Sequence, residues 1–196
     1  MKLRLYYPCK PYPVFQGFGM CDPQVCELYK KMGLKGHNGE DVACPSDTPL
    51  YAAHDGVVVY AGEDGSSGYL VVIRTDMQYD YKEGQSYFKS LYAHLKRDGI
   101  KVKAGQVVKT GDLIALSDNT GLSKGPHLHF GLKPVYKGEL EWTWDNVEAT
   151  NGYRGAIDPS PYWVGIFAQD VPHQIVILRA FVSQLLQKVA DLLAKR

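Results

Sequence analysis

Two histidines one residue apart form the chain's most specific chemical signal. Residues 126–130 read PHLHF, and the apolar neighbours of His127 and His129 favour a short β-strand. Residues two apart in a strand face the same side, so both imidazoles share one face. They could both bind a metal ion, or one could bind it while the other handles protons. Two solvated histidines on a strand would look the same, so this chemistry requires partners elsewhere.

Such partners occur earlier in the chain. His37 and Asp41 are four residues apart, in a stretch whose Gly36 and Gly39 disfavour a helix. In an extended segment these two side chains also share a face. Two imidazole nitrogens and a carboxylate oxygen suit zinc, and three protein ligands leave the fourth tetrahedral position for water. His94 supplies a further imidazole that the metal would not need.

The segments that must position these residues are short strands. The chain has 196 residues, of which 45% are hydrophobic and 22% charged, and this is enough for one domain with a full core. Apolar runs separated by glycine, without helices between them, predict a mainly β fold of antiparallel strands. A polar, tyrosine-rich segment over 76–87 predicts a long hairpin loop. The strands are expected near 14–18, 56–60, 69–73, 90–95, 105–108, 111–115 and 126–130.

Two helices are predicted outside this core. Asp22 and Pro23, followed by Gly33, indicate a short N-terminal helix of about ten residues. A heptad pattern predicts a C-terminal amphipathic helix within 166–196, so residues 1–165 are assigned to the main domain. That helix could dock on a domain or form a homo-oligomer through 170–196; its polar face is less suited to a membrane surface. The heptad positions are Val171, Ile175, Leu178, Val182, Leu185, Val189 and Leu192.

The four cysteines leave their redox state open. If the N-terminal helix includes Cys21 and Cys26, they lie about 8 Å apart, which is beyond the reach of a disulfide. A bridge from Cys9 to either one remains open, as do four thiols. A structural zinc site is less favoured, because the spacing with Cys44 is irregular.

Bulk properties exclude several partners. A net charge of +1 gives no electrostatic reason to expect nucleic acid. The sequence contains no run of about 18 apolar residues, so we expect no transmembrane segment. The proline-interrupted start has no apolar stretch typical of a secretory signal. His54 and His173 have no obvious partners, and we interpret both as structural or surface residues.

The order of motifs resembles a known family. His-x-x-x-Asp at 37–41, Tyr-Ala-His-Leu at 92–95 and Gly-Pro-His-Leu-His-Phe at 125–130 resemble the lysostaphin-type zinc endopeptidases, or LytM domain, which cut peptide bonds in bacterial peptidoglycan. The resemblance covers roughly residues 14–163. Further matching segments lie at 37–45, 48–53, 55–58, 105–112, 119–121 and 157–159.

The resemblance implies a role for each of the five residues. His37, Asp41 and His129 would bind one Zn²⁺ per chain, and His94 and His127 would be the catalytic pair that does not bind it. We favour His127 as the general base because its strand neighbour is a ligand, although His94 could also serve. The resemblance also implies antiparallel sheets that form an open groove.

The implied function is a zinc metalloendopeptidase, a peptidoglycan hydrolase that acts on stem or crossbridge peptides of the cell wall, outside the cytoplasm. A phage or prophage lysin (endolysin) would fit the absence of a signal, and the export route and the bond cut stay open. The alternatives are a non-catalytic LytM-like activator or scaffold of cell-wall remodelling, and a zinc hydrolase with another substrate.

Two departures from the family pattern stand out. Asp118 occupies a position where the family often has glycine, which affects a turn and not the chemistry. The segment 132–156 is longer than the shortest version found in the family. It forms either a wall of the substrate groove or a surface loop packed by its own aromatic residues. Those residues are Tyr136, Trp142, Trp144 and Tyr153.

Overall fold

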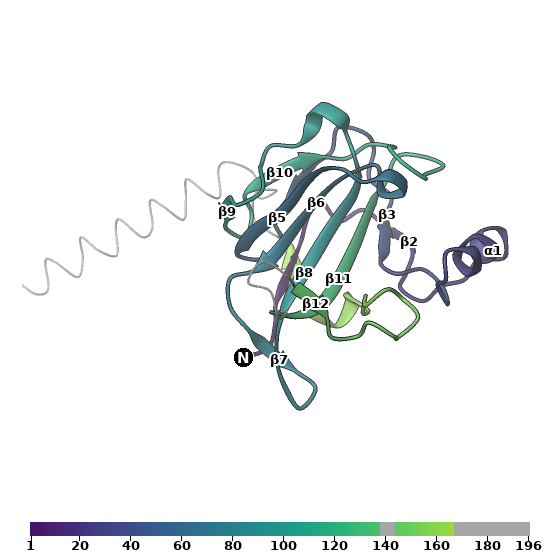
Figure 1. The fold of residues 1–196 in the computed structure, drawn as a ribbon. Helices are drawn as coiled ribbons and strands as arrows, with labels where there is room; N and C mark the ends of the chain where they lie inside the picture. Colours follow the sequence, from purple (N-terminus) through teal and green to yellow (C-terminus); the bar gives the residue numbers. More distant parts are fainter. Residues whose placement is uncertain (138–143, 167–196) are drawn as a thin grey trace, which may run out of the picture. The chain divides into compact units, whose positions relative to one another are not determined.

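One large antiparallel sheet organises the molecule (Figure 1). The structure is a computed structural model that describes residues 1–137 and 144–166. Along the sheet the strands follow the order β2-β3-β11-β8-β6-β5-β9. Their bounds are β2 Val14–Gln16, β3 Glu40–Val42, β11 Leu128–Lys137, β8 Gly84–Leu95, β6 Tyr69–Thr75, β5 Gly56–Glu63 and β9 Val107–Val108.

Shorter elements pair with the ends of this sheet or cover it. β12 (Trp144–Asn146) pairs with the end of β11, and β7 (Tyr79–Tyr81) pairs with the start of β8. β4 (Pro49–Tyr51) and β10 (Leu113–Leu116) form a small antiparallel sheet. β1 (Leu5–Tyr7) and β13 (Trp163–Ile166) pair in parallel, which the purely antiparallel prediction did not include. Single 3₁₀ turns span Gly65–Ser67, Arg97–Gly99 and Ser160–Tyr162.

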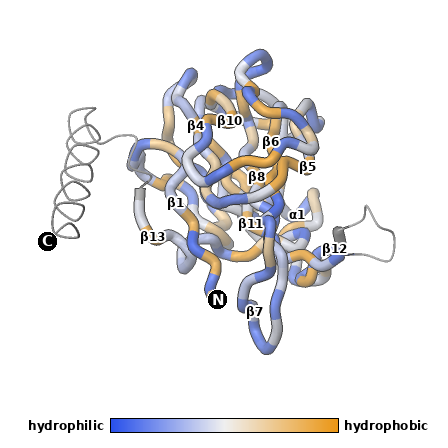
Figure 2. Tube along the Cα trace, turned by 90° about the vertical axis from the view of Figure 1, so that its left-hand side faces the viewer, coloured by the Kyte–Doolittle hydropathy of each residue, from blue (hydrophilic) through white to orange (hydrophobic). Residues whose placement is uncertain are grey.

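The core packs against one face of the large sheet, because alternate strand residues point to it. On β8, Phe88, Ser90 and Tyr92 are fully buried, whereas the residues between them are partly exposed. The facing β4–β10 pair contributes buried Leu50 and Ile114. Figure 2 shows the result: the central strands are largely hydrophobic, and the β7 hairpin at the edge is hydrophilic. The predicted mainly β fold is confirmed.

The predicted N-terminal helix is also confirmed. Helix α1 spans Pro23–Lys31, and its first turn begins with hydrogen bonds from Val25 N–H and Cys26 N–H to Asp22 O. Gly33 has φ +74°, a left-handed conformation in which glycine carries no steric penalty, and the helix ends there.

The prediction that Cys21 and Cys26 lie beyond disulfide reach is wrong. They form a disulfide with a Cα–Cα distance of 4.8 Å. Helical rise does not separate them, because α1 starts at Pro23 and Cys21 belongs to the turn before it. Cys9 and Cys44 are buried thiols, and a hydrogen bond joins their side chains.

The tyrosine-rich segment over 76–87 contains more strand than predicted. It forms the β7–β8 hairpin, in which Tyr79 lies opposite Ser86 and Tyr81 opposite Gly84. The amino terminus of Met1 makes an ion pair with Asp80 of this hairpin, at 2.8 Å.

Some predictions concern residues outside the described part. Trp142, His173 and the helix expected within 166–196 belong to them, so the division into 1–165 and 166–196 and the homo-oligomer stay predictions. Among the described residues, no helix has the length and apolar character needed to cross a membrane.

A hydrogen bond links the large sheet to the segment that covers its core face, and its contribution to stability can be tested. The buried hydroxyl of Tyr92 accepts the N–H of Ala53 at 2.8 Å. Tyr92→Phe leaves this buried donor without a partner, so we expect the free energy of unfolding to fall by about 1–3 kcal/mol in urea denaturation. Tyr136→Phe, at a half-exposed site, is the control and should change little. Equal stability of the Tyr92 variant and the wild type would contradict this role.

Candidate metal centre

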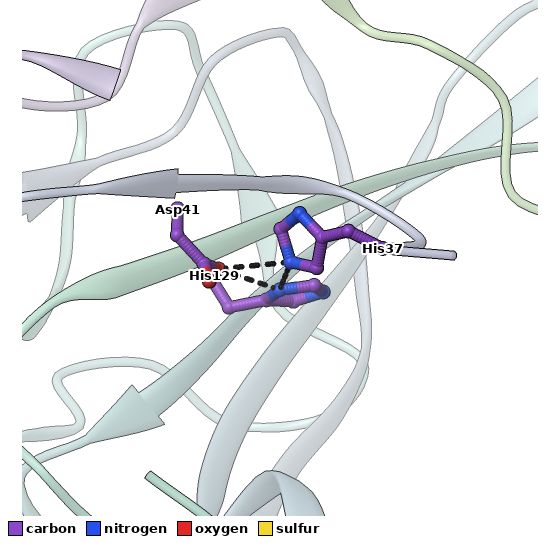
Figure 3. Close-up of side chains that lie close together, drawn as sticks. All are labelled: His37, Asp41 and His129. Atoms are coloured by element: carbon purple, nitrogen blue, oxygen red, sulfur yellow. Dashed lines mark hydrogen bonds and ion pairs between the residues drawn. The ribbon is translucent and has the colours of Figure 1, made fainter. Parts of the chain in front are cut away.

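Three side chains from two segments that are distant in sequence meet above β3 and β11 (Figure 3). Asp41 and His129 lie directly opposite each other in the pairing of these strands, and His37 reaches them from the loop before β3. Asp41 Oδ1 is 2.9 Å from His129 Nδ1 and 3.1 Å from His37 Nε2, and the two nitrogens are 3.0 Å apart. The structure therefore brings the three predicted ligands together.

Two glycines allow this close approach. A Cβ on Gly39 would lie 2.4 Å from Phe130 O and 2.7 Å from the His129 ring, and a Cβ on Gly36 would lie 2.6 Å from Gly19 O. Both contacts are shorter than any side chain tolerates. Gly39 thus lets the 36–41 segment pack against β11, and Gly36 lets it pack against the backbone at Gly19.

Backbone carbonyls fix the protonated nitrogen in three of the four imidazoles. Since a carbonyl oxygen only accepts, the Nδ1 atom of each ring carries a hydrogen, which leaves Nε2 as the atom that can bind a metal ion or exchange a proton. The bonds run from His37 to Gly17 O at 3.2 Å, from His94 to Thr120 O at 2.8 Å and from His127 to Gly125 O at 2.8 Å.

His94 and His127 form a second pair beside the cluster. Their ring centroids are 4.6 Å apart, and His127 Nε2 is 3.6 Å from Asp41 Oδ1. His94 has φ +61°, a left-handed conformation that costs a non-glycine residue about 1–2 kcal/mol. Strain of this kind persists where the surrounding structure imposes it, and here it directs the ring towards the site.

Burial and neighbours set the charges of the cluster. Burial raises the pKa of Asp41, but hydrogen bonds from His129 and His37 outweigh it, and the pKa of the carboxyl lies below its usual value. Burial, with a smaller contribution from the neighbouring His127 and His129, lowers the pKa of His94 to about 4. Burial also lowers the pKa of His129. The hydrogen bonds to Asp41 therefore favour its ionised form, and burial favours the neutral forms of His94 and His129.

This donor set fits a divalent cation. His37 Nε2 and Asp41 Oδ1 lie 3.1 Å apart, and both can give a lone pair to a cation when the His37 ring carries its hydrogen on Nδ1. Neighbouring ligands of a tetrahedral zinc ion are separated by roughly 3.3 Å, since each bond is about 2.0–2.1 Å long. The measured separations of 2.9–3.1 Å are close to that value.

Sequence reasoning missed three residues around the cluster. Phe15, which is 55% exposed, contacts the His127 ring edge-on at 5.6 Å, and Tyr29 of α1 stacks on His37 at 5.9 Å. Burial and the Asp41 charge raise the pKa of Tyr29 to about 12. Gln16 lies opposite Asp41, and its buried Nε2 has no hydrogen-bond partner among the described residues. Only tertiary packing brings these side chains to the site.

Two further predictions concern His54 and Asp118. His54 is structural, as expected: its buried ring donates Nδ1–H to Asp55 O and hydrogen-bonds Ser90 Oγ through Nε2, both at 2.8 Å. Asp118 bridges the segments of the catalytic candidates, because its N–H donates to His94 O and its carbonyl accepts from His127 N–H.

The 132–156 segment is partly described. β11 continues into it and pairs with β12, and the Tyr153 ring packs on Phe18 at 4.6 Å. Its role as a groove wall stays a prediction.

The match to a family defines the class of protein. Residues 35–140 match the sequence model of Peptidase family M23, and the chain belongs to this family.

Relatives and solved structures agree with this assignment. The chain is 43% identical over 94 residues to the peptidoglycan DD-endopeptidase ShyB of Vibrio cholerae, a match covering 48% of this chain and 20% of ShyB. The chain thus spans about a fifth of the length of the curated relatives it matches. A zinc-containing peptidase from Vibrio cholerae superposes with TM-score 0.54 at 29% identity, over 74% of this chain and 39% of that one. Lysostaphin from Staphylococcus simulans shares the fold, with TM-score 0.52 at 24% identity, over 77% and 48% of the two chains.

The close packing around Gly39 predicts the effect of adding a single methyl group at that position. Gly39→Ala forces the His129 ring or the Phe130 carbonyl to move, so we expect zinc affinity to fall at least about tenfold in competition titrations with a chromophoric chelator. Gly84→Ala is the matched control, because no atom lies within 4 Å of its added Cβ. Unchanged affinity in the Gly39 variant would show that the close packing does not position the ligands.

The low pKa of His94 predicts acid sensitivity of the metal-free protein. The pKa of an unfolded histidine is about 6.5, whereas that of folded His94 is about 4. Between these values the unfolded chain binds a proton that the folded chain does not, so stability falls as pH drops below about 6.5, by up to roughly 3 kcal/mol near pH 4.

His94→Asn tests this link, since asparagine tolerates a left-handed backbone. Urea denaturation of the metal-free proteins at pH 7.5 and pH 5 should show a smaller loss of stability in the variant than in the wild type. Equal losses would mean that His94 does not carry the acid sensitivity.

Proposed function

We propose that the chain is a zinc-dependent endopeptidase that hydrolyses peptide bonds in bacterial peptidoglycan, and so acts on the cell wall outside the cytoplasm. One observation carries the proposal: three metal-ligand side chains converge, and the Nε2 atom of a third imidazole, that of His127, lies 3.6 Å from the same carboxylate. Membership of Peptidase family M23 and the names of the relatives, which are peptidoglycan DD-endopeptidases, support it.

His37, Asp41 and His129 would hold the zinc ion. When bound, zinc polarises the scissile carbonyl and lowers the pKa of water towards neutrality. The Nδ1–H bond from His37 to Gly17 O orients that ring and keeps its Nε2 available as a ligand atom. The Asp41 charge offsets part of the charge of a divalent cation.

His127 is the better candidate for the general base. Its Nε2 lies 3.6 Å from Asp41 Oδ1, so the carboxylate stabilises the imidazolium that forms when His127 accepts a proton. The bond from its Nδ1 to Gly125 O holds the ring in the correct tautomer. His127 can then return the proton to the leaving amine.

His94 is suited to a supporting role. With a pKa of about 4 it is a weak base at neutral pH, and its ring packs against that of His127. It can orient the His127 ring and contact the substrate. A non-catalytic LytM-like scaffold is the alternative function, and the complete set of five side chains favours the enzyme over it.

Single substitutions distinguish the proposed metal ligands from the proposed catalytic residues. His129→Ala should lose bound zinc, measured by mass spectrometry of the purified protein, together with the digestion of sacculi. His94→Ala and His127→Ala should retain zinc and lose activity, His127→Ala by about 10²–10⁴-fold. His54→Asn is a control outside the cluster and should keep both properties at some loss of stability.

The outcome that would contradict the role assignment is specific. If His94→Ala and His127→Ala both digested sacculi at the wild-type rate, neither residue would be catalytic. A zinc-loaded wild-type protein without activity on any sacculi would favour the scaffold instead.

A further inference from the structure

Three basic side chains lie in direct register across three neighbouring strands. Arg74 of β6 is opposite Lys89 of β8, and Lys89 is opposite Lys133 of β11. Residues directly opposite each other in antiparallel strands share a face, so the three form a continuous cationic row.

The cationic row lies on the face that carries the metal centre. Lys133 is four residues beyond His129 on β11, and the register with β8 is unbroken between them, so both side chains point to the same side. The strand rise places them about 13 Å apart along the strand. The opposite face is the core side, where Phe88 and Phe130 are fully buried.

The three charges of the row repel one another. Like charges directly opposite each other on a sheet are destabilising, and all three residues are only partly exposed. Burial lowers the pKa of Lys89, and Arg74 lowers it further. Burial lowers the pKa of Lys133 as well, and Lys89 and Arg154 add to the effect. The charges of Asp145 and Asp64 act in the opposite direction on Lys89 and Lys133, respectively, and a bound anion would offset the repulsion further.

The surroundings of the row suit an organic anion. A hollow of about 470 Å³ adjoins Lys89 and is lined mainly by valines, Tyr60 and Gly105. Val57, one of these valines, lies opposite Arg74 and continues the row. The guanidinium of Arg74 lies over the Tyr87 ring at 5.2 Å, which restricts its orientation. A peptide carboxylate with an aliphatic stem matches a surface that combines cations with apolar residues.

We propose that the cationic row binds a free carboxylate of the substrate peptide, away from the bond that is cut. This inference rests on the proposed function. An extended peptide advances about 3.3–3.6 Å per residue, so the carboxylate would lie about four residues from the scissile bond. Arg74, Lys89 and Lys133 would then select acidic peptides over amidated ones.

The test compares two crosslinked stem-peptide fragments from sacculi, one with free carboxylates and one with its non-terminal carboxylates amidated. We expect kcat/KM of the wild type to be at least about tenfold higher for the acidic fragment, with the difference mainly in KM. Lys89→Gln and Lys133→Gln should each reduce that ratio towards one. Lys101→Gln removes an exposed lysine outside the row and should keep the wild-type ratio.

Thermal unfolding separates a binding role from a structural one. Because Lys89→Gln removes repulsion within the row, its Tm should equal or exceed that of the wild type. A lower Tm with equal loss of activity on both fragments would mean that Lys89 is structural, and would overturn the proposal. So would a wild-type enzyme that cleaves both fragments equally well.

If the proposed function were wrong, the result would differ from that expected when only the cationic-row proposal is wrong. In that case the wild type would cleave neither fragment. Fluorescence anisotropy with labelled fragments needs no turnover and measures the same selectivity: tighter binding of the acidic fragment, reduced in Lys89→Gln, supports the row, and equal binding of both fragments contradicts it.

Discussion

The pairing of β3 with β11 is the constraint on which the site depends. It sets Asp41 opposite His129, and the buried carboxylate then lies within 3.6 Å of three imidazoles. Slippage of either strand by one residue would turn one of these side chains to the core face. The packing of Gly39 against β11 and the carbonyl bonds that orient the rings all presuppose this register.

Most of the correct predictions came from the two-residue periodicity of β-strands. Because His127 and His129 are two residues apart, both rings were correctly predicted to share one face. The glycines around His37 correctly predicted that no helix forms there. The short-strand pattern also predicted the mainly β fold. Such features depend on local backbone geometry, which the residue types determine directly.

Features that depend on tertiary packing were not predictable in the same way. The Cys21–Cys26 disulfide depends on where α1 begins, within a residue or two. The contacts of Phe15 and Tyr29 with the histidines, and the left-handed backbone of His94, arise only when distant segments meet. The same holds for the cationic row, which appears only when three strands are aligned and which puts a second polar feature on the face of the metal centre.

Anomalous X-ray diffraction from zinc-soaked crystals, recorded above and below the zinc absorption edge, would show directly which side chains bind the metal ion. We expect one zinc peak bonded to His37 Nε2, a carboxylate oxygen of Asp41 and His129 Nδ1, with His94 and His127 outside the bonding distance. A peak bonded to His94 or His127, or no peak between the three ligand atoms, would contradict this expectation.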